Sequence, residues 1–204
     1  MKKIVVVIVG LFISVQVSAQ DDRGFFYIGP GLSIASAPDQ FADSHKTGYN
    51  FGGGFGFNVA KGLTVITDVT FNKLSLDETG FLTSLGVPVG SVPTVDGGDV
   101  SIYSFMANIM YFLPTGIPDF FPFVTGGAGL YSYSLDAVYY EYQDEPFEVH
   151  SDSQTKFGYN FGAGMNFLLS DEYGIFVAGR YFKEKQDFSH LTFSAGLVVP
   201  FKTQ

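Results

Sequence analysis

The chain has 204 residues, which allows one domain with a sizeable core. Charged residues make up 15%, aromatic residues reach 17%, and the absence of cysteine excludes disulfides, thiolate metal sites and a cysteine nucleophile. A formal net charge of −9 argues against a nucleic-acid partner, because the phosphates would be repelled.

The first segment has the pattern of a cleavable signal peptide. Lys2 and Lys3 precede an apolar run over residues 4–13, and Val17 and Ala19 supply small side chains before a cleavage site at Gln20. A membrane-spanning helix needs about 20 apolar residues, so the run is too short for one. We therefore predict a signal peptide over residues 1–19 and a mature domain over residues 20–204.

After Gln20 the apolar side chains alternate with a period of two, which predicts strands rather than helices. Most of the segments run for about ten residues or more, the length that a tilted strand needs to cross a bilayer. The predicted strands are residues 24–35, 49–58, 63–73, 100–113, 121–135, 156–169, 174–184 and 189–201.

The links between these strands alternate in length. Short links cover residues 60–62, 114–120 and 170–173, whereas long polar links cover residues 36–47, 75–99 and 136–155. The last link, near residues 185–188, is short although it lies on the long side. Short turns on one rim and long loops on the other are typical of outer-membrane barrels. Residues 80–98 carry few charges and many glycines, so we predict no regular structure there.

One sequence repeat stands out. Residues 48–54 read GYNFGGG and residues 158–164 read GYNFGAG, and each copy opens a predicted hairpin. In a ring of eight strands these two hairpins lie opposite each other. Duplication of a four-stranded unit and convergence of two similar strands both explain the repeat.

The choice between a soluble and a membrane barrel depends on the polar face of the strands. A soluble barrel would carry charges there, but the strands at residues 49–58, 100–113, 121–135 and 189–201 have none. Their less apolar face is Gly, Asn, Ser and Thr, which suits the narrow interior of an eight-stranded barrel. Tyrosines near strand ends predict an interfacial aromatic girdle, formed by Tyr27, Tyr49, Tyr111, Tyr131, Tyr133, Tyr159, Tyr173 and Tyr181. The predicted fold is an all-β, eight-stranded antiparallel up-and-down transmembrane β-barrel.

The signal peptide, the eight strands, the PFVTGGAGLY segment at residues 122–131 and the aromatic Phe201 in the last strand resemble the OmpA/OmpX-type family of small outer-membrane barrels. The resemblance implies a multi-pass protein of the Gram-negative cell outer membrane that is exported through the periplasm. It also implies contact with outer-membrane lipid and lipopolysaccharide, and with the barrel-assembly machinery during biogenesis. Members commonly end on an aromatic residue, whereas this chain continues with Lys202, Thr203 and Gln204.

Two charges stand out on the predicted inner face. Asp68 lies in the third strand and Arg180 in the seventh, on opposite sides of an eight-stranded ring. A lone charge in a narrow lumen is costly, so we expect the two to form an ion pair across it. We further expect them to form a polar plug against free water flow together with Asn50, Asn108, Asn160 and Glu184.

Signals for catalysis or metal binding are weak. His45, His150 and His190 lack the spacing of metal ligands, and the long acidic links lack the D-x-D-x-D-G calcium pattern. His150, Ser151 and Asp152 are adjacent, so on an extended segment their side chains point in alternating directions. We predict no catalytic residues, no metal site and no cofactor. The leading hypothesis is a structural or surface-interaction role through the long acidic loops; a narrow solute channel and a lipid-modifying enzyme are the alternatives.

Overall fold

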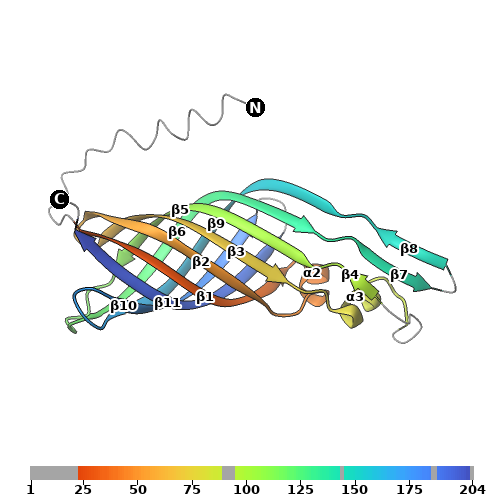
Figure 1. Cartoon of the computed structure of the whole chain (residues 1–204), viewed down its shortest axis with the longest axis horizontal. Coiled ribbons are helices and arrows are strands. Elements are labelled where there is room, and N and C mark those ends of the chain that lie inside the picture. Colours follow the sequence, from red (N-terminus) through yellow and green to blue (C-terminus); the bar gives the residue numbers. More distant parts are fainter. Residues whose placement is uncertain (1–22, 89–94, 143–144, 185–187, 203–204) are drawn as a thin grey trace, which may run out of the picture.

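The computed structural model describes residues 23–88, 95–142, 145–184 and 188–202, so the predicted signal peptide lies outside the described residues. Eight antiparallel strands form a closed barrel (Figure 1). These strands are β1 (Arg23–Ala37), β2 (Gly48–Ala60), β3 (Leu63–Leu74), β5 (Val100–Phe112), β6 (Phe120–Leu135), β9 (Asp152–Leu168), β10 (Gly174–Glu184) and β11 (Ser189–Lys202). All eight predicted strands and the all-β transmembrane-barrel architecture are confirmed, with the start of β9 four residues earlier than expected.

The ring order is β1-β11-β10-β9-β6-β5-β3-β2, so every strand pairs with two neighbours. Closure matters because a backbone N–H or C=O facing hydrocarbon has no water to bond. The first and last strands pair from Arg23 with Lys202 to Ala37 with Ser189. In this order β3 and β10 lie on opposite sides of the barrel, as do the hairpins β2–β3 and β9–β10 that carry the sequence repeat.

The alternation of side chains separates an apolar outer face from a mixed interior. In β3, Thr64, Ile66 and Asp68 are buried, whereas Val65 and Val69 are exposed on the outside. An exposed apolar side chain is unfavourable in water but not in hydrocarbon. The outer face therefore suits lipid.

The aromatic girdle is confirmed in part. Near the rim of the long loops, Tyr49 packs on Phe71 and Phe71 on Tyr103, all pointing outward, at centroid distances of 6.2 and 4.9 Å. The assignment of Tyr27, Tyr131 and Tyr133 to the girdle is wrong, because all three point inward: the Tyr27 hydroxyl bonds to Asp68, Tyr131 is fully buried, and Tyr133 packs against the buried cluster near the barrel mouth.

The long links fold into a cap beyond one rim of the barrel, at the end opposite the start of β1 and the end of β11 (Figure 1). The prediction of no regular structure over residues 80–98 is wrong, since a helix ends and a short strand lies within that range. The elements of the cap are α2 (Asp39–Asp43), α3 (Glu78–Ser84), β4 (Val95–Gly97), β7 (Val138–Tyr142) and β8 (Glu145–Val149), with the three strands in the order β4-β7-β8.

Backbone hydrogen bonds tie the first two long links together. The Lys46 N–H donates to the Ser75 carbonyl at 2.9 Å, and the Asp77 N–H donates to the Ser44 carbonyl at 2.7 Å. The carboxylate of Asp77 caps α3 by accepting from the N–H groups of Thr79 and Gly80. These contacts give the cap a defined shape although its elements are short.

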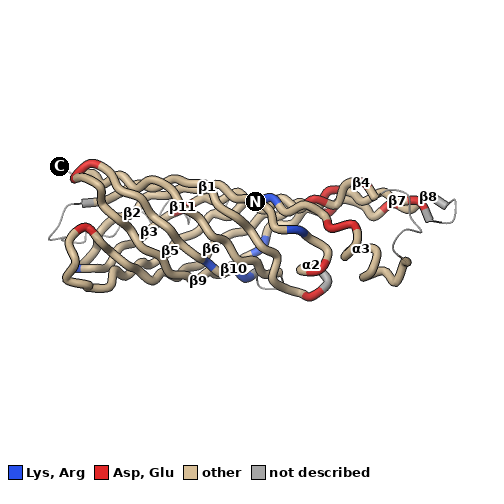
Figure 2. Tube along the Cα trace, turned by 90° about the horizontal axis from the view of Figure 1, so that it is seen from below, with Lys and Arg blue, Asp and Glu red and all other residues tan. Residues whose placement is uncertain are grey.

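Charge is distributed unevenly along the molecule. Figure 2 shows a barrel wall almost free of charged residues, whereas Asp and Glu gather in the cap and at the turns of the other end. Among the described residues, no helix has the length and hydropathy required to cross a membrane.

Candidate functional site

The centre of the lumen holds an ion pair between opposite walls. Arg180 Nη1 of β10 lies 2.7 Å from Asp68 Oδ2 of β3, and the two side chains are 10% and 0% exposed. The structure therefore brings the two charges of β3 and β10 into direct contact across the lumen. An unpaired charge at such a buried position would be strongly destabilising, so each charge compensates the other.

Tyr27 of β1 bonds to both members of this pair, a contact that the sequence analysis did not predict. Its hydroxyl donates to Asp68 Oδ2 at 2.9 Å and accepts from Arg180 Nη2 at 2.9 Å. A hydroxyl can do both at once, so Tyr27 bonds to both members of the pair. The parity of Tyr27 with the buried Phe25 was the signal that could have placed it inside.

Two of the predicted asparagines extend the cluster. Asn108 of β5 donates to Asp68 Oδ2 at 2.8 Å, and Asn160 of β9 donates to Asn108 Oδ1 at 2.7 Å. A continuous chain of hydrogen bonds therefore runs from β9 through β5 and β3 to β10. We call Asp68, Arg180, Tyr27, Asn108 and Asn160 the central polar cluster.

Of the other two predicted members, the structure describes the side chain of Asn50 but not that of Glu184. Asn50 of β2 belongs to a separate network nearer the cap, where it donates to the Leu32 carbonyl at 2.7 Å and accepts from Ser194 at 2.9 Å. Ser33 links this network to Asn72 at 2.8 Å. The Glu184 side chain lies outside the described part of the chain, so its membership of the plug stays a prediction.

Glycines on the inner wall make room for the cluster. A Cβ atom at Gly162 would lie 2.8 Å from Arg180 Cγ, and one at Gly54 would lie 2.7 Å from Asp68 Cβ. Gly162 pairs with Arg180, and Gly54 pairs with Asp68, across neighbouring strands. The two glycine-rich copies of the repeat therefore flank the two charges from opposite walls.

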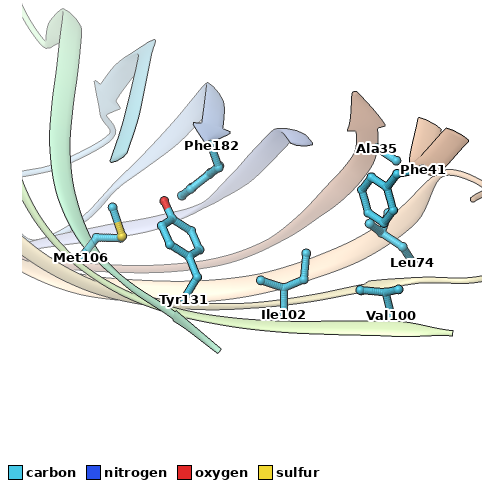
Figure 3. Close-up of a cluster of buried hydrophobic side chains, with 8 residues drawn as sticks. All are labelled: Ala35, Phe41, Leu74, Val100, Ile102, Met106, Tyr131 and Phe182. Atoms are coloured by element: carbon cyan, nitrogen blue, oxygen red, sulfur yellow. The ribbon is translucent and has the colours of Figure 1, made fainter. Parts of the chain in front are cut away.

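Apolar layers close the lumen on both sides of the central polar cluster. On the cap side the rings of Tyr131 and Phe182 face each other at 6.1 Å and 85°, beside Met106 (Figure 3). Towards the short turns a second layer consists of Phe25, Ile66, Met110, Phe123 and Val198. Among the described residues, the cavity beside Tyr27 and Arg180 measures about 20 Å³, room for about one water molecule.

The remaining candidate residues do not form a reactive site. His150, Ser151 and Asp152 are all exposed, with the first two in the link before β9 and Asp152 as its first residue. His45 contacts the Phe41 carbonyl through Nδ1 at 3.0 Å, and His190 stacks on Phe182 at 4.9 Å with an interplanar angle of 2°. Within the described ranges, no group of three or more His, Asp or Glu residues is arranged to hold a metal ion.

A closed ring of eight strands, with an apolar outer face, a tightly filled lumen and long loops on one rim, defines the class of small outer-membrane β-barrels. The family model described as "Outer membrane protein beta-barrel domain" matches residues 5–201, so the chain belongs to this family and is an outer-membrane protein. No curated protein sequence matches the chain.

Solved structures support the same fold. Neisserial surface protein A superimposes with a TM-score of 0.60 at 17% identity, covering 87% of this chain and 97% of that one. Ail of Yersinia pestis gives 0.55 at 16% identity, with coverage of 89% and 100%, and OprG of Pseudomonas aeruginosa gives 0.56 at 11% identity, with coverage of 91% and 98%. The resemblance to small barrels of the OmpA/OmpX type and the outer-membrane location are thereby confirmed.

Proposed function

We propose that this protein is a non-enzymatic outer-membrane barrel that presents a folded, acidic cap at the cell surface for contact with a partner. The observation that carries the proposal is the three-stranded sheet of the cap, which extends beyond the rim (Figure 1). Its exposed side chains include Tyr139, 50% exposed, on one face and Phe147, 45% exposed, on the other. Exposed aromatic side chains are enriched where proteins bind one another.

The charge of the long links indicates which partner the cap suits. Residues 36–47, 75–99 and 136–155 hold 12 of the 20 Asp and Glu residues of the chain but one of its 11 Lys and Arg residues. A surface of one sign attracts partners of the opposite sign and repels those of its own. We therefore expect a basic partner. Ail has been solved in complex with the heparin analogue sucrose octasulfate, a polyanion that this acidic cap would repel.

The filled lumen favours this role over the solute channel. A channel needs a continuous water path, whereas the described lumen has apolar layers on both sides of a paired charge. The exposed His150, Ser151 and Asp152 give little support to a lipid-modifying enzyme, because nucleophilic catalysis needs a base held against its nucleophile. The lipid and lipopolysaccharide contacts and the passage through the barrel-assembly machinery belong to the same proposal.

Binding of a basic probe to the protein in lipid nanodiscs tests the proposal. A fluorescent oligolysine peptide should bind, and binding should weaken as ionic strength rises. The double variant Glu141→Gln/Glu148→Gln removes two exposed acids of the cap sheet and should reduce binding. The matched control Asp171→Asn/Glu172→Gln removes two exposed acids at the opposite rim and should leave binding unchanged. Equal losses in both double variants, or tighter binding of heparin than of the peptide, would contradict a cap-specific role.

A further inference from the structure

An apolar pocket lies between the cap and the mouth of the barrel. Its volume is about 280 Å³. The wall on the barrel side comes from Val100, Ile102 and Tyr133, and the wall on the cap side comes from Phe41, Leu76 and Val138. Figure 3 shows Phe41, Val100 and Ile102 around this end of the lumen. None of the members of the central polar cluster lines the pocket, and neither do Tyr139 and Phe147 of the cap sheet.

The side chains around the pocket favour an uncharged ligand. None of the described residues that line it is Asp, Glu, Lys or Arg, and most are aliphatic or aromatic. A charged group moved into such surroundings loses its hydration without a compensating partner. The acidic links around the entrance further disfavour an anion.

Two polar groups in the pocket have an unused hydrogen-bonding atom, Nε2 of His45 and Nε2 of His190, and His190 is the more deeply buried of the two. His190 is 3% exposed and lines the pocket, and its ring is held parallel to Phe182. Its Nε2 atom has no hydrogen-bond partner among the described residues. A buried polar atom without a partner is costly, so a ligand that bonds to it would recover part of that cost. A ligand hydroxyl can hydrogen-bond to Nε2 in either tautomer of the ring, because a hydroxyl both donates and accepts.

The volume sets the size of the ligand. An apolar cavity of about 150 Å³ binds benzene, so a pocket of about 280 Å³ accommodates two fused rings or an acyl chain of similar volume. We propose that this pocket binds a small, uncharged hydrophobic alcohol, with its apolar body between the cap and the barrel mouth and its hydroxyl on His190 Nε2.

Binding of 2-naphthol, with naphthalene as the matched probe without a hydroxyl, tests the site. The full chain in lipid nanodiscs, with ¹⁵N-labelled histidine, is titrated with each probe while the ring nitrogen resonances and the bound fraction are followed. Empty nanodiscs measure partition into lipid. His190→Phe keeps a ring against Phe182 but removes Nε2, and Ser84→Trp and Val138→Trp fill the pocket from two sides. Leu32→Trp introduces the same side chain on the lipid face as a control.

The proposal predicts saturable binding of 2-naphthol with a shift of the His190 Nε2 resonance, and naphthalene binding about tenfold weaker. His190→Phe should lower the affinity for 2-naphthol to that for naphthalene, the filling variants should abolish saturable binding, and Leu32→Trp should leave it intact. If His190→Phe does not fold, the difference in affinity between 2-naphthol and naphthalene on the native chain still tests whether the hydroxyl contributes to binding. Uptake equal to that of empty nanodiscs, equal affinities for the two probes, or tighter binding of anionic 2-naphthoate would overturn the proposal.

Discussion

Asp68 and Arg180 lie 112 residues apart in the chain, yet Arg180 Nη1 approaches Asp68 Oδ2 to 2.7 Å in the middle of the lumen. The contact joins the hairpin β2–β3 to the hairpin β9–β10 from opposite walls of the ring. The pair acts inside a lumen that lipid does not enter, in surroundings that screen charge weakly. Removing either charge therefore has consequences for the whole barrel.

Single substitutions of the pair should be strongly destabilising, but their effects should not add. Asp68→Ala or Arg180→Ala leaves one buried charge without its partner, which lowers the free energy of unfolding by about 3–5 kcal/mol. The double variant should lose less than the sum of the single losses, with a coupling of about 1–3 kcal/mol. Urea unfolding of the four proteins in lipid vesicles measures these values. Additive losses would mean that the pair does not interact.

Tyr27→Phe removes the hydroxyl that bonds to both members of the pair while it keeps the ring. Loss of hydrogen bonds to charged groups should lower the free energy of unfolding by about 1.5–3 kcal/mol. Tyr111→Phe is the matched control, because Tyr111 is exposed on the outer face and its change should stay within about 0.5 kcal/mol. Equal effects of the two substitutions in the same urea assay would argue against a role for Tyr27 in the cluster.

Gly127→Ala and Gly126→Ala test the room that the inner wall leaves for the cluster. A Cβ atom at Gly127 would lie 2.3 Å from Asn108 Oδ1, whereas one at the outward-facing Gly126 has its nearest contact at 3.6 Å. We expect Gly127→Ala to destabilise the barrel by about 1–3 kcal/mol through overpacking, and Gly126→Ala to be tolerated. Thermal unfolding of the two variants compares neighbouring positions on opposite faces. A greater loss in Gly126→Ala would contradict this assignment of faces.

The cap should become less stable in mild acid. Burial lowers the pKa of the His45 imidazole below its usual value of 6.5, so the folded cap holds this ring neutral where the unfolded segment binds a proton. The stability of the cap is therefore complete above about pH 6.5 and falls as the pH drops below that value. Amide exchange protection of α2, corrected for the intrinsic exchange rate, should decrease from neutral pH to pH values well below 6.5. In His45→Gln the protection of α2 should depend less on pH. An unchanged pH dependence would mean that other titratable groups, and not His45, cause it.

Much of the barrel was predictable because lipid and a narrow lumen impose a strict period of two. The Asp68–Arg180 contact followed from lone inward charges on strands that an eight-stranded ring places opposite each other. Tyr27, Tyr131 and Tyr133 were misplaced because their position near strand ends was given more weight than their parity with inward residues. The cap could not be derived from the sequence, since α2, α3 and β4 are short and are held by contacts between distant links. The alternation in β7 and β8 carried a signal that could have indicated their hairpin.

The central polar cluster, between two apolar layers, closes the lumen. Conductance across a planar lipid bilayer that contains the purified protein tests this closure most directly. The structure predicts no steady conductance for the native chain, and openings in Asp68→Ala/Arg180→Ala, where the charges that join the walls are gone. A steady, ohmic conductance of the native protein that the double variant leaves unchanged would contradict the claim.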